Sequence, residues 1–168
     1  AGLYVIIDWH ILSDGNPRTY EKQAVRFFKK MASRYKGHTN ILYEICSEPN
    51  GRTSWRTIKT YAKKVIPAIR AQDKNAVILI GTPNWSQDVD SAAKDPIKGY
   101  KNLMYTLHFY AGTHKADLRK KAQTALDKKL PLFVSEFGIS DASGNGALDK
   151  KEGARWMSYL KSRKSSYI

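Results

Sequence analysis

Short apolar runs rich in β-branched residues recur along the chain, and helix-like segments separate them. Five such runs occur, over residues 3–7, 41–45, 77–80, 103–107 and 132–134. Their hydrophobicity is nearly continuous, which indicates strands that are buried on both faces, as in a parallel sheet covered by helices. This repeated alternation of strand and helix predicts an α/β fold built on a parallel sheet.

The segments between the runs have a helical period. Apolar residues step by three and four over 20–35 and 55–69, a weaker stripe covers 118–126, and a fourth covers 156–160. A short helix is expected over 89–93. Two architectures fit this pattern, an open doubly wound sheet and a (β/α)8 barrel. No Gly-x-Gly-x-x-Gly follows the first run and no glycine-rich loop carries a phosphate-binding Lys-Ser/Thr pair, so the nucleotide-binding form of the open sheet lacks its usual sign.

The length of 168 residues is enough for one domain with a sizeable core, so residues 1–168 are expected to form a single unit. No apolar run is long enough to cross a bilayer, which predicts a soluble protein without a membrane partner. The chain begins in a strand-like run without the features of a signal peptide, so either a leader was removed or the sequence starts within a longer protein. The one cysteine, Cys46, excludes an internal disulfide, and its apolar surroundings predict a core residue.

The net charge raises nucleic acid as a possible partner. The chain has 29 Lys and Arg against 15 Asp and Glu, a formal charge of +14. These charges are dispersed, mostly on the polar sides of the helix-like segments. Only residues 161–164 form a compact basic cluster, and it lacks the interleaved aromatic residues of a surface that binds single strands. A solvated face is therefore favoured, and nucleic acid is ranked last among the partners.

Each apolar run ends in polar residues that a purely structural strand does not need. The runs are followed by Asp8-Trp9-His10, Ser47-Glu48, the segment 82–85, His108-Phe109-Tyr110 and the segment 135–138. In a parallel barrel all these strand ends share one rim, where active sites are built. Two carboxylates, Glu48 and Glu136, are therefore expected to meet in one cleft.

Paired carboxylates at such a rim indicate glycoside hydrolysis. Cleavage of an acetal needs a proton for the leaving oxygen and an anion facing the anomeric carbon. One glutamate would serve as proton donor and the other as nucleophile. The competing interpretation is that each glutamate caps a helix or pairs with a lysine, and the nearby His108, Tyr110 and Trp85 favour the catalytic one.

Several other side chains are assigned to the cleft or the core. His108 and Tyr110 are two apart on a strand and so point the same way, and we expect both to hydrogen-bond one carboxylate and hold it ionised. His10 is a further inward donor, and Trp85 offers a flat face for stacking on a glucose ring. Asn50, Asn84 and Asp88 either line the cleft or form turns. The expected core tryptophans are Trp9, Trp55 and Trp156, and the histidines expected to face solvent are His38 and His114.

Taken together, these stretches resemble the endo-β-1,4-glucanases, or cellulases, of glycoside hydrolase family 5, and the bacterial-type branch in particular. The resemblance rests on YVIIDWHILSDGNP, NILYEICSEPNG, IKTYAKKVIPAIRAQDKNAVILIGTPNWSQDV, LMYTLHFYAGTH and LFVSEFGIS, which cover essentially the whole chain in the family's order. It implies a (β/α)8 TIM barrel, a retaining double displacement without metal or other cofactor, a cellulose, related β-glucan or cello-oligosaccharide substrate, and secretion.

Matching the motifs residue by residue also implies roles. Glu48 falls on the Glu of the family's Asn-Glu-Pro, the general acid/base, and Glu136 falls on the nucleophile. The supporting positions are His10, His108 and Tyr110 in the active site and Trp85 as a sugar platform. Ser47 stands where the family has an asparagine that donates to the sugar 2-OH, and loss of such a transition-state donor costs roughly 10²- to 10³-fold in rate.

The chain is short for this family. A complete barrel takes about 250 residues, so the five runs are expected to be about strands three to seven with their helices, without strands one, two and eight. Such a piece would leave two open edges and part of its core exposed, and we expect a homo-oligomer or a complementing fragment to cover them. A second hypothesis follows, in which the chain is a weakened or inactive glucan-binding or assembly fragment.

Overall fold

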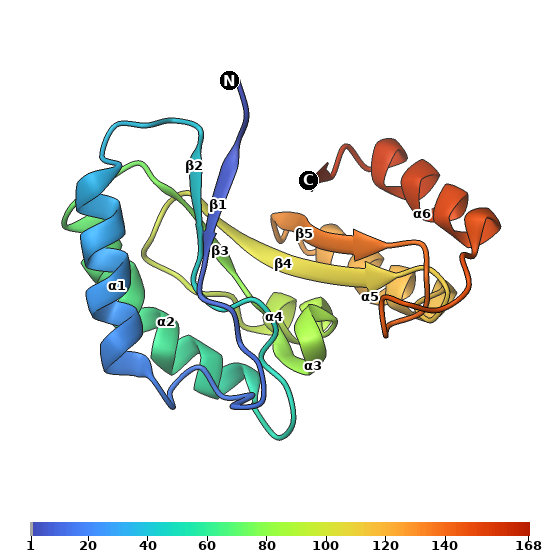
Figure 1. The fold of residues 1–168 in the computed structure, drawn as a ribbon, viewed down its shortest axis with the longest axis horizontal. Helices are drawn as coiled ribbons and strands as arrows, with labels where there is room; N and C mark the ends of the chain where they lie inside the picture. Colours follow the sequence, from blue (N-terminus) through green and yellow to red (C-terminus); the bar gives the residue numbers. More distant parts are fainter. Residues whose placement is uncertain (1) are drawn as a thin grey trace.

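Parallel strands follow one another around a curved sheet in the same order as in the chain (Figure 1). They are β1 (Val5–Asp8), β2 (Ile41–Glu44), β3 (Val77–Ile80), β4 (Leu103–Tyr110), β5 (Leu132–Gly138) and β6 (Ser166–Tyr167). This computed structural model describes residues 2–168. Each strand pairs in parallel with the next, without a reversal of order. That order is the wall of a (β/α)8 barrel, and it excludes the doubly wound alternative.

Helices connect the strands and cover the convex side of the sheet (Figure 1). They are α1 (Glu21–Arg34), α2 (Trp55–Arg70), α3 (Pro83–Ser86), α4 (Val89–Lys94), α5 (Ala116–Asp127) and α6 (Lys150–Ser162). The apolar stripe of α2 forms the buried face of that helix. Ser54 caps the start of α2, because its hydroxyl accepts the backbone N–H of Thr57 at 3.2 Å. The predicted helices are thus confirmed, and α6 begins well before its stripe at 156–160.

The sheet separates a large core from a small one. The large core lies between the convex face and the helices and includes Phe28, Ile58 and Trp156. The small core lies on the concave face and consists of strand residues, with Leu42, Leu79 and Phe133 buried at its centre. Two positions further along the same strands, the concave side chains become polar: these are Asp8 on β1, Glu44 on β2, Thr106 on β4 and Ser135 on β5. The half-barrel interior therefore changes from apolar to acidic towards the carboxyl ends of the strands.

The five predicted strands are present, but the prediction that the eighth barrel strand is missing was wrong. A sixth strand, β6, pairs in parallel with β5 through Phe133 with Ser166 and Val134 with Tyr167. It has two residues, both exposed, so it carries none of the continuous hydrophobicity by which the other strands were found. Within residues 2–168 no helix combines the length and the hydrophobicity needed to cross a bilayer.

The open side of the half-barrel carries exposed apolar surface. Tyr4, near β1, and Ile168, after β6, line one hollow together with Leu42 and Phe133 of the concave core. The two edge strands of the sheet therefore border the same unfilled space. Large apolar side chains are exposed along this rim at Leu3, Tyr4, Val5, Tyr167 and Ile168. This is the exposed surface that an incomplete barrel was expected to leave.

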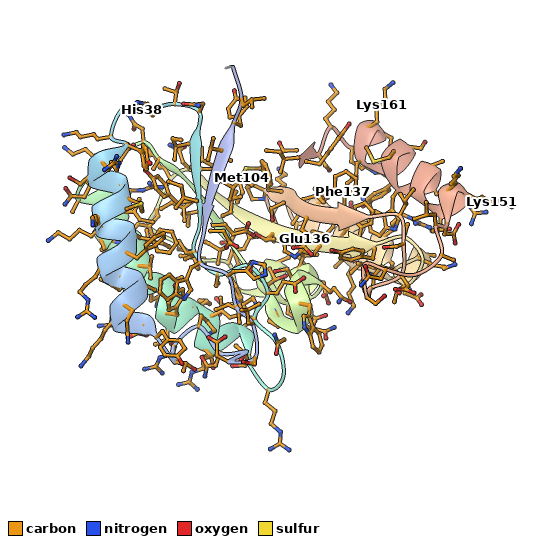
Figure 2. All side chains as sticks on the ribbon, viewed as in Figure 1. His38, Met104, Glu136, Phe137, Lys151 and Lys161 are labelled. Carbon is orange, nitrogen blue, oxygen red and sulfur yellow. The ribbon has the colours of Figure 1, made fainter. Side chains whose placement is uncertain are left out.

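The core assignments agree with the structure. Cys46 is fully buried, and burial raises the pKa of its thiol. Trp55 and Trp156 are buried, and Trp9 packs against Phe27 with ring centroids 5.5 Å apart. Figure 2 shows two of the lysines, Lys151 and Lys161, on α6 at the edge of the molecule, away from Glu136 in its centre.

Candidate active site

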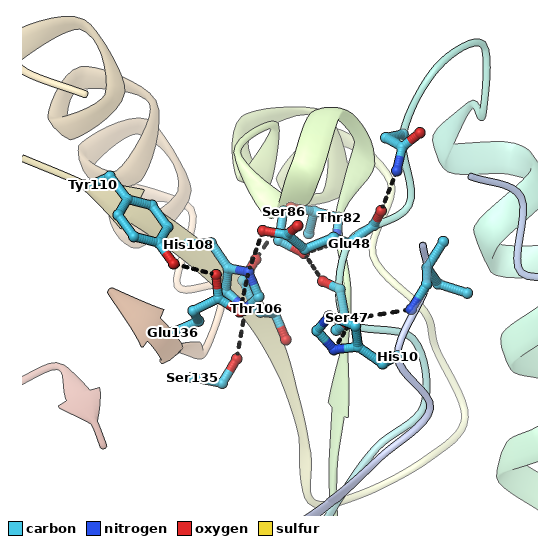
Figure 3. Close-up of polar contacts among 12 residues, drawn as sticks. His10, Ser47, Glu48, Thr82, Ser86, Thr106, His108, Tyr110, Ser135 and Glu136 are labelled. Carbon is cyan, nitrogen blue, oxygen red and sulfur yellow. Dashed lines mark hydrogen bonds and ion pairs between the residues drawn. The ribbon is translucent and has the colours of Figure 1, made fainter. Parts of the chain in front are cut away.

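A pocket of about 530 Å³ opens at the carboxyl ends of the strands, where the concave interior is acidic. Its walls come from the ends of β2, β3, β4 and β5 and from the segments that follow them (Figure 3). The lining residues are Glu48, Asn84, Trp85, Gln87, His108, Tyr110, His114, Glu136 and Ala142. The structure thus brings together five of the seven predicted site residues in one pocket.

Glu48 lies in the loop after β2, and hydrogen bonds from Trp85 and Ser86 hold that loop in place. The Ser86 hydroxyl donates to the carbonyl oxygen of Ser47, and the Trp85 N–H donates to the carbonyl oxygen of Pro49 at 3.0 Å. Gly81, at the end of β3, allows this close approach, because a Cβ there would lie 2.0 Å from the carbonyl oxygen of Cys46. The loop therefore cannot shift without disturbing β3.

Glu136 reaches the pocket because β5 contains a β-bulge. Thr106 pairs with Phe133, and the next pair along the strands is His108 with Glu136, so β5 has one more residue than β4 between these pairs. The alternation of a regular strand would direct Ser135 and Glu136 to opposite faces. The extra residue shifts the alternation, and both side chains contact His108.

The His108 imidazole lies between the two glutamates. Its Nδ1 is 2.9 Å from Glu48 Oε1 and 3.9 Å from Glu136 Oε2. One oxygen of Glu48 and one of Glu136 lie within 4.8 Å of each other. Burial lowers the pKa of His108, but the carboxylates of Glu44 and Glu48 and the charge of Glu136 outweigh it and raise that pKa to about 9. A cation therefore lies between two acids at neutral pH.

Tyr110 serves the second carboxylate. Its hydroxyl donates to Glu136 Oε1 at 2.9 Å. Burial, followed by the hydrogen bond to Glu136, raises the pKa of Tyr110 to about 12, so the phenol stays a neutral donor. The expectation that His108 and Tyr110 hydrogen-bond the same carboxylate was wrong: His108 bonds Glu48 and Tyr110 bonds Glu136 (Figure 3). Because of the bulge in β5, Glu136 pairs with His108 across the two strands. The phenol of Tyr110, two residues further along β4, reaches Glu136 from there.

His10 and Ser47 lie beside the pocket and do not line it. Ser47 is buried, and its hydroxyl accepts the backbone N–H of Ile11 at 3.2 Å and contacts His10 Nδ1 at 3.2 Å. The same His10 nitrogen is 2.8 Å from Asp8 Oδ2. The Ser47 hydroxyl therefore already has partners away from Glu136, and its predicted contact with a sugar hydroxyl stays a prediction.

Trp85 lies in an unusual turn. Asn84, Trp85 and Ser86 have φ of 58°, 55° and 56°, a left-handed conformation that is strained for residues with a Cβ. The side chain of Trp85 is 47% exposed and lines the pocket. A strained turn that exposes a large aromatic face beside two acids is consistent with the predicted sugar platform.

The remaining polar predictions have mixed outcomes. Asn84 lines the pocket, whereas Asp88 pairs with Lys121 at 2.6 Å and Asn50 donates to the carbonyl oxygen of Glu48 at 3.0 Å. The expectation that His114 faces solvent was wrong. It is half-buried, lines the pocket and accepts the Tyr110 N–H at 2.8 Å, because the chain turns back immediately after β4.

Sequence reasoning missed the buried polar layer beneath the pocket. Glu44 is only 4% exposed, and its Oε1 accepts hydroxyl hydrogen bonds from Thr106 at 3.0 Å and from Ser135 at 2.8 Å. On the neighbouring strand, Asp8 pairs with Glu44 in register. Burial, and next the charge of Glu44, raise the pKa of Asp8 to about 6. The sequence carries one signal for this layer, which is the acidic residue Glu44 inside an otherwise apolar strand.

Glu48, His108 and Glu136 each offer an atom that can bind a metal ion, within 4.8 Å of one another. The donor chemistry fits a metal poorly, because a histidine with a pKa of about 9 is protonated at neutral pH and has no free nitrogen lone pair. The hydrogen bond between His108 and Glu48 and the charge contact between His108 and Glu136 explain their closeness. The prediction that no metal takes part stays a prediction.

A family model described as cellulase (glycosyl hydrolase family 5) matches residues 1–168. The chain is 54% identical over 166 residues to an endoglucanase of Clostridium saccharobutylicum, with 98% of this chain and 37% of the relative covered. It is 48% identical over 159 residues to endoglucanase A of Butyrivibrio fibrisolvens, with 95% of this chain and 36% of the relative covered. The chain thus spans about a third of the length of these relatives.

Solved structures share the fold. The cellulase Cel5C_n superposes with a TM-score of 0.97 at 49% identity, covering 99% of this chain and 52% of that one. The catalytic domain of Thermobifida fusca endoglucanase Cel5A gives a TM-score of 0.92 at 40% identity, covering 99% of this chain and 56% of that one. A variant of that domain, in complex with cellotetraose, gives 0.92 at 39% identity. The residues therefore correspond to about half of a solved catalytic domain.

Proposed function

The chain belongs to glycosyl hydrolase family 5, and from this premise we propose that it hydrolyses internal β-1,4-glucosidic bonds with retention of configuration, using Glu48 and Glu136. The observation that supports this most is the distance between these two side chains. One oxygen of each lies within 4.8 Å of the other. Retaining glycosidases hold their carboxyl groups about 5 to 5.5 Å apart, whereas inverting enzymes leave room for a water molecule between them.

In the first step Glu48 protonates the oxygen of the leaving sugar while Glu136 attacks the anomeric carbon. The bond between the anomeric carbon and the leaving oxygen breaks, and an ester between the sugar and Glu136 forms. Tyr110 donates to Glu136 in the free enzyme and fixes the direction of its carboxylate. The His108 imidazolium stabilises the negative charge that appears on Glu48 when its proton leaves.

In the second step a water molecule takes the place of the departed sugar. Glu48, now a carboxylate, accepts a proton from this water, and the water oxygen attacks the anomeric carbon. The ester bond breaks, Glu136 is released as a carboxylate and Glu48 is protonated again. Two inversions at the same carbon give a product with the configuration of the substrate.

The substrate of this proposal is cellulose or a related β-1,4-glucan. Trp85 offers an exposed aromatic face beside the two acids, which suits the apolar face of a glucose ring. The structurally similar Thermobifida fusca domain has been solved with cellotetraose. An insoluble polymer of this kind cannot enter a cell, so the proposal places the activity outside the cell.

A burst experiment tests the mechanism. With a chromogenic cellobioside we expect a burst of phenol release followed by slower turnover, because the ester on Glu136 accumulates. Glu136→Gln abolishes the burst. Glu48→Gln keeps the first step on a dinitrophenyl cellobioside, whose leaving group needs no proton, and loses hydrolysis of unactivated glucan. Proton NMR should detect the β-anomer first, and initial appearance of the α-anomer contradicts retention.

The alternative is a glucan-binding or assembly fragment with little turnover. The exposed apolar rim and the hollow shared by Tyr4 and Ile168 favour it, because they leave the half-barrel open. We propose that a second copy or a complementing fragment covers this rim. Analytical ultracentrifugation combined with a reducing-sugar assay on the same sample decides: binding of cello-oligosaccharide without product supports the fragment, and turnover by an assembled species supports the enzyme.

A further inference from the structure

Glu44 is a buried acid to which the proposed mechanism gives no role. It lies on β2 beneath the pocket and is almost completely shielded from solvent. Burial of a carboxylate is costly unless hydrogen bonds compensate it. Its Oε1 accepts from two hydroxyls, those of Thr106 on β4 and Ser135 on β5. The site therefore holds a carboxylate oxygen in place as an acceptor.

The hydrogen bond from Ser135 to Glu44 determines which His108 nitrogens carry protons. A serine hydroxyl has one proton, and Ser135 directs it to Glu44 at 2.8 Å. The same Ser135 oxygen is 2.9 Å from His108 Nε2. Because the hydroxyl proton is already used, the oxygen can only accept, so Nε2 must carry a proton. The other ring nitrogen of His108, Nδ1, faces Glu48.

Acidic side chains from β2, from the loop after β2 and from β5 surround His108. Glu44 Oε1 is 3.7 Å from Nε2, Glu48 Oε1 is 2.9 Å from Nδ1, and Glu136 Oε2 is 3.9 Å from Nδ1. Asp8 lies one strand further away, in register with Glu44. Of these acids only Glu44 is both buried and outside the pocket, so it does not contact the substrate, whereas Glu48 and Glu136 react with it.

We propose that Glu44 is a positioning residue that acts through Ser135 to keep His108 an imidazolium, with Nδ1–H donated to Glu48 Oε1. This inference rests on the proposed function. Because this hydrogen bond uses Oε1 of Glu48, Oε2 is free to carry the proton that goes to the leaving oxygen. Before the first step Glu44 and Glu136 are negative, His108 is positive and Glu48 is neutral; afterwards Glu136 is an ester and Glu48 is negative. The net charge of these four groups is therefore the same before and after the first step.

Titration of the histidines by NMR tests the coupling without any substrate. The four histidines are few enough to resolve, and His108→Asn identifies the resonance of His108. Glu44→Gln, which keeps the shape of the side chain, should lower the pKa of His108 by roughly 1 to 3 units, because an opposite charge within about 4 Å is lost. Glu44→Asp retains the charge and should keep that pKa near the value of the unmodified protein. Ser135→Ala removes the acceptor of Nε2–H and should lower it as well.

Asp8→Asn is the matched control, because it also removes one negative charge from the polar layer but has no hydrogen bond to Ser135. It should lower the pKa of His108 less than Glu44→Gln does. An unchanged pKa in both Glu44→Gln and Ser135→Ala overturns the proposal, and so does an equal decrease in Glu44→Gln and Asp8→Asn. The Ser135 variant keeps the test decisive if Glu44→Gln fails to fold.

Kinetics then separates this inference from the proposed function. On soluble glucan, Glu44→Gln should lower kcat by roughly 10- to 100-fold, as expected when one charge-assisted hydrogen bond weakens, with little change in KM. The basic limb of its pH profile should move to lower pH along with the pKa of His108. If the unmodified protein shows no turnover, the proposed function fails while the NMR titration still decides the role of Glu44. A large change in KM with an unshifted pH profile overturns the positioning role.

Discussion

Ser135 and Glu136 are consecutive residues of β5, yet both side chains reach the same imidazole. Ser135 Oγ is 2.9 Å from His108 Nε2, and Glu136 Oε2 is 3.9 Å from His108 Nδ1. The bulge in β5 makes this possible, because one extra residue brings two neighbouring side chains to one face. A single irregularity of the backbone thus connects the buried acid beneath the pocket with the carboxylate inside it.

The first prediction concerns Tyr110→Phe, which removes the hydrogen bond to Glu136 without altering the ring. A hydrogen bond to a charged group contributes about 1.5 to 3 kcal/mol, so kcat/KM on soluble glucan should fall by roughly 10- to 100-fold. Since the pKa of Tyr110 is raised to about 12, the phenol does not titrate in the working range. The ratio of the two activities should be constant from about pH 5 to about pH 9. A ratio that varies with pH contradicts a neutral donor.

The strand ends were predictable because a parallel sheet places its carboxyl ends together, whatever the details of the strands. That rule predicted one shared rim for Glu48 and Glu136, and the bulge in β5 turns the Glu136 side chain into the pocket. The partners of each acid were not predictable, because they depend on the bulge in β5 between Phe133 and Glu136. Regular alternation predicts that His108 and Tyr110 hydrogen-bond the same carboxylate. Because β5 has one extra residue, each of them bonds a different carboxylate.

A second prediction concerns the pH dependence of stability. Burial and the charge of Glu44 raise the pKa of Asp8 to about 6, above its ordinary value of 3.8. Between these values the folded protein binds more protons than the unfolded chain, so the contribution of Asp8 to the free energy of unfolding falls as pH rises and is lost above about pH 6. Asp8→Asn should therefore raise the free energy of unfolding by roughly 2 kcal/mol at neutral pH.

Urea denaturation near pH 4 and near pH 8 measures this effect. Below about pH 4 Asp8 is protonated in the folded state, so the variant and the unmodified protein should be similarly stable there. The buried Oδ1 of Asp8 has no hydrogen-bond partner among residues 2–168, and an amide at this position can donate to Glu44. The same gain at both pH values would show that packing, and not charge, is responsible.

A third prediction concerns Ser47, where the family motif has asparagine. Ser47→Asn restores an amide that can donate to the sugar 2-OH, and kcat/KM on soluble glucan should rise by up to roughly 10²-fold. The amide oxygen can also accept the Ile11 N–H, as the serine hydroxyl does now. Ser47→Ala is the control, because it leaves that buried N–H without an acceptor and should cost about 1 to 3 kcal/mol of stability. No gain in the asparagine variant would indicate that the missing barrel strands limit the rate.

Two features of the fold were beyond sequence patterns for different physical reasons. Strand β6 has too few residues to show a period, and it forms only because β5 offers an unpaired edge. Glu44 is an acid in a strand that reads as apolar, and its compensation comes from Thr106 and Ser135, which are distant in the sequence. Periodicity describes the faces of an element, whereas these two features depend on what lies across the sheet.

The last prediction uses the left-handed turn that carries Trp85. Both Trp85→Ala and Trp85→Gly remove the aromatic face, and each should raise KM for cello-oligosaccharides by roughly 3- to 10-fold with a smaller effect on kcat. The two variants differ in the backbone, since φ of Trp85 is 55° and alanine keeps the Cβ that strains this conformation. The glycine variant should therefore be more stable than the alanine variant by about 1 kcal/mol. Equal stability of the two in urea denaturation contradicts the left-handed turn, and an unchanged KM in both contradicts the sugar platform.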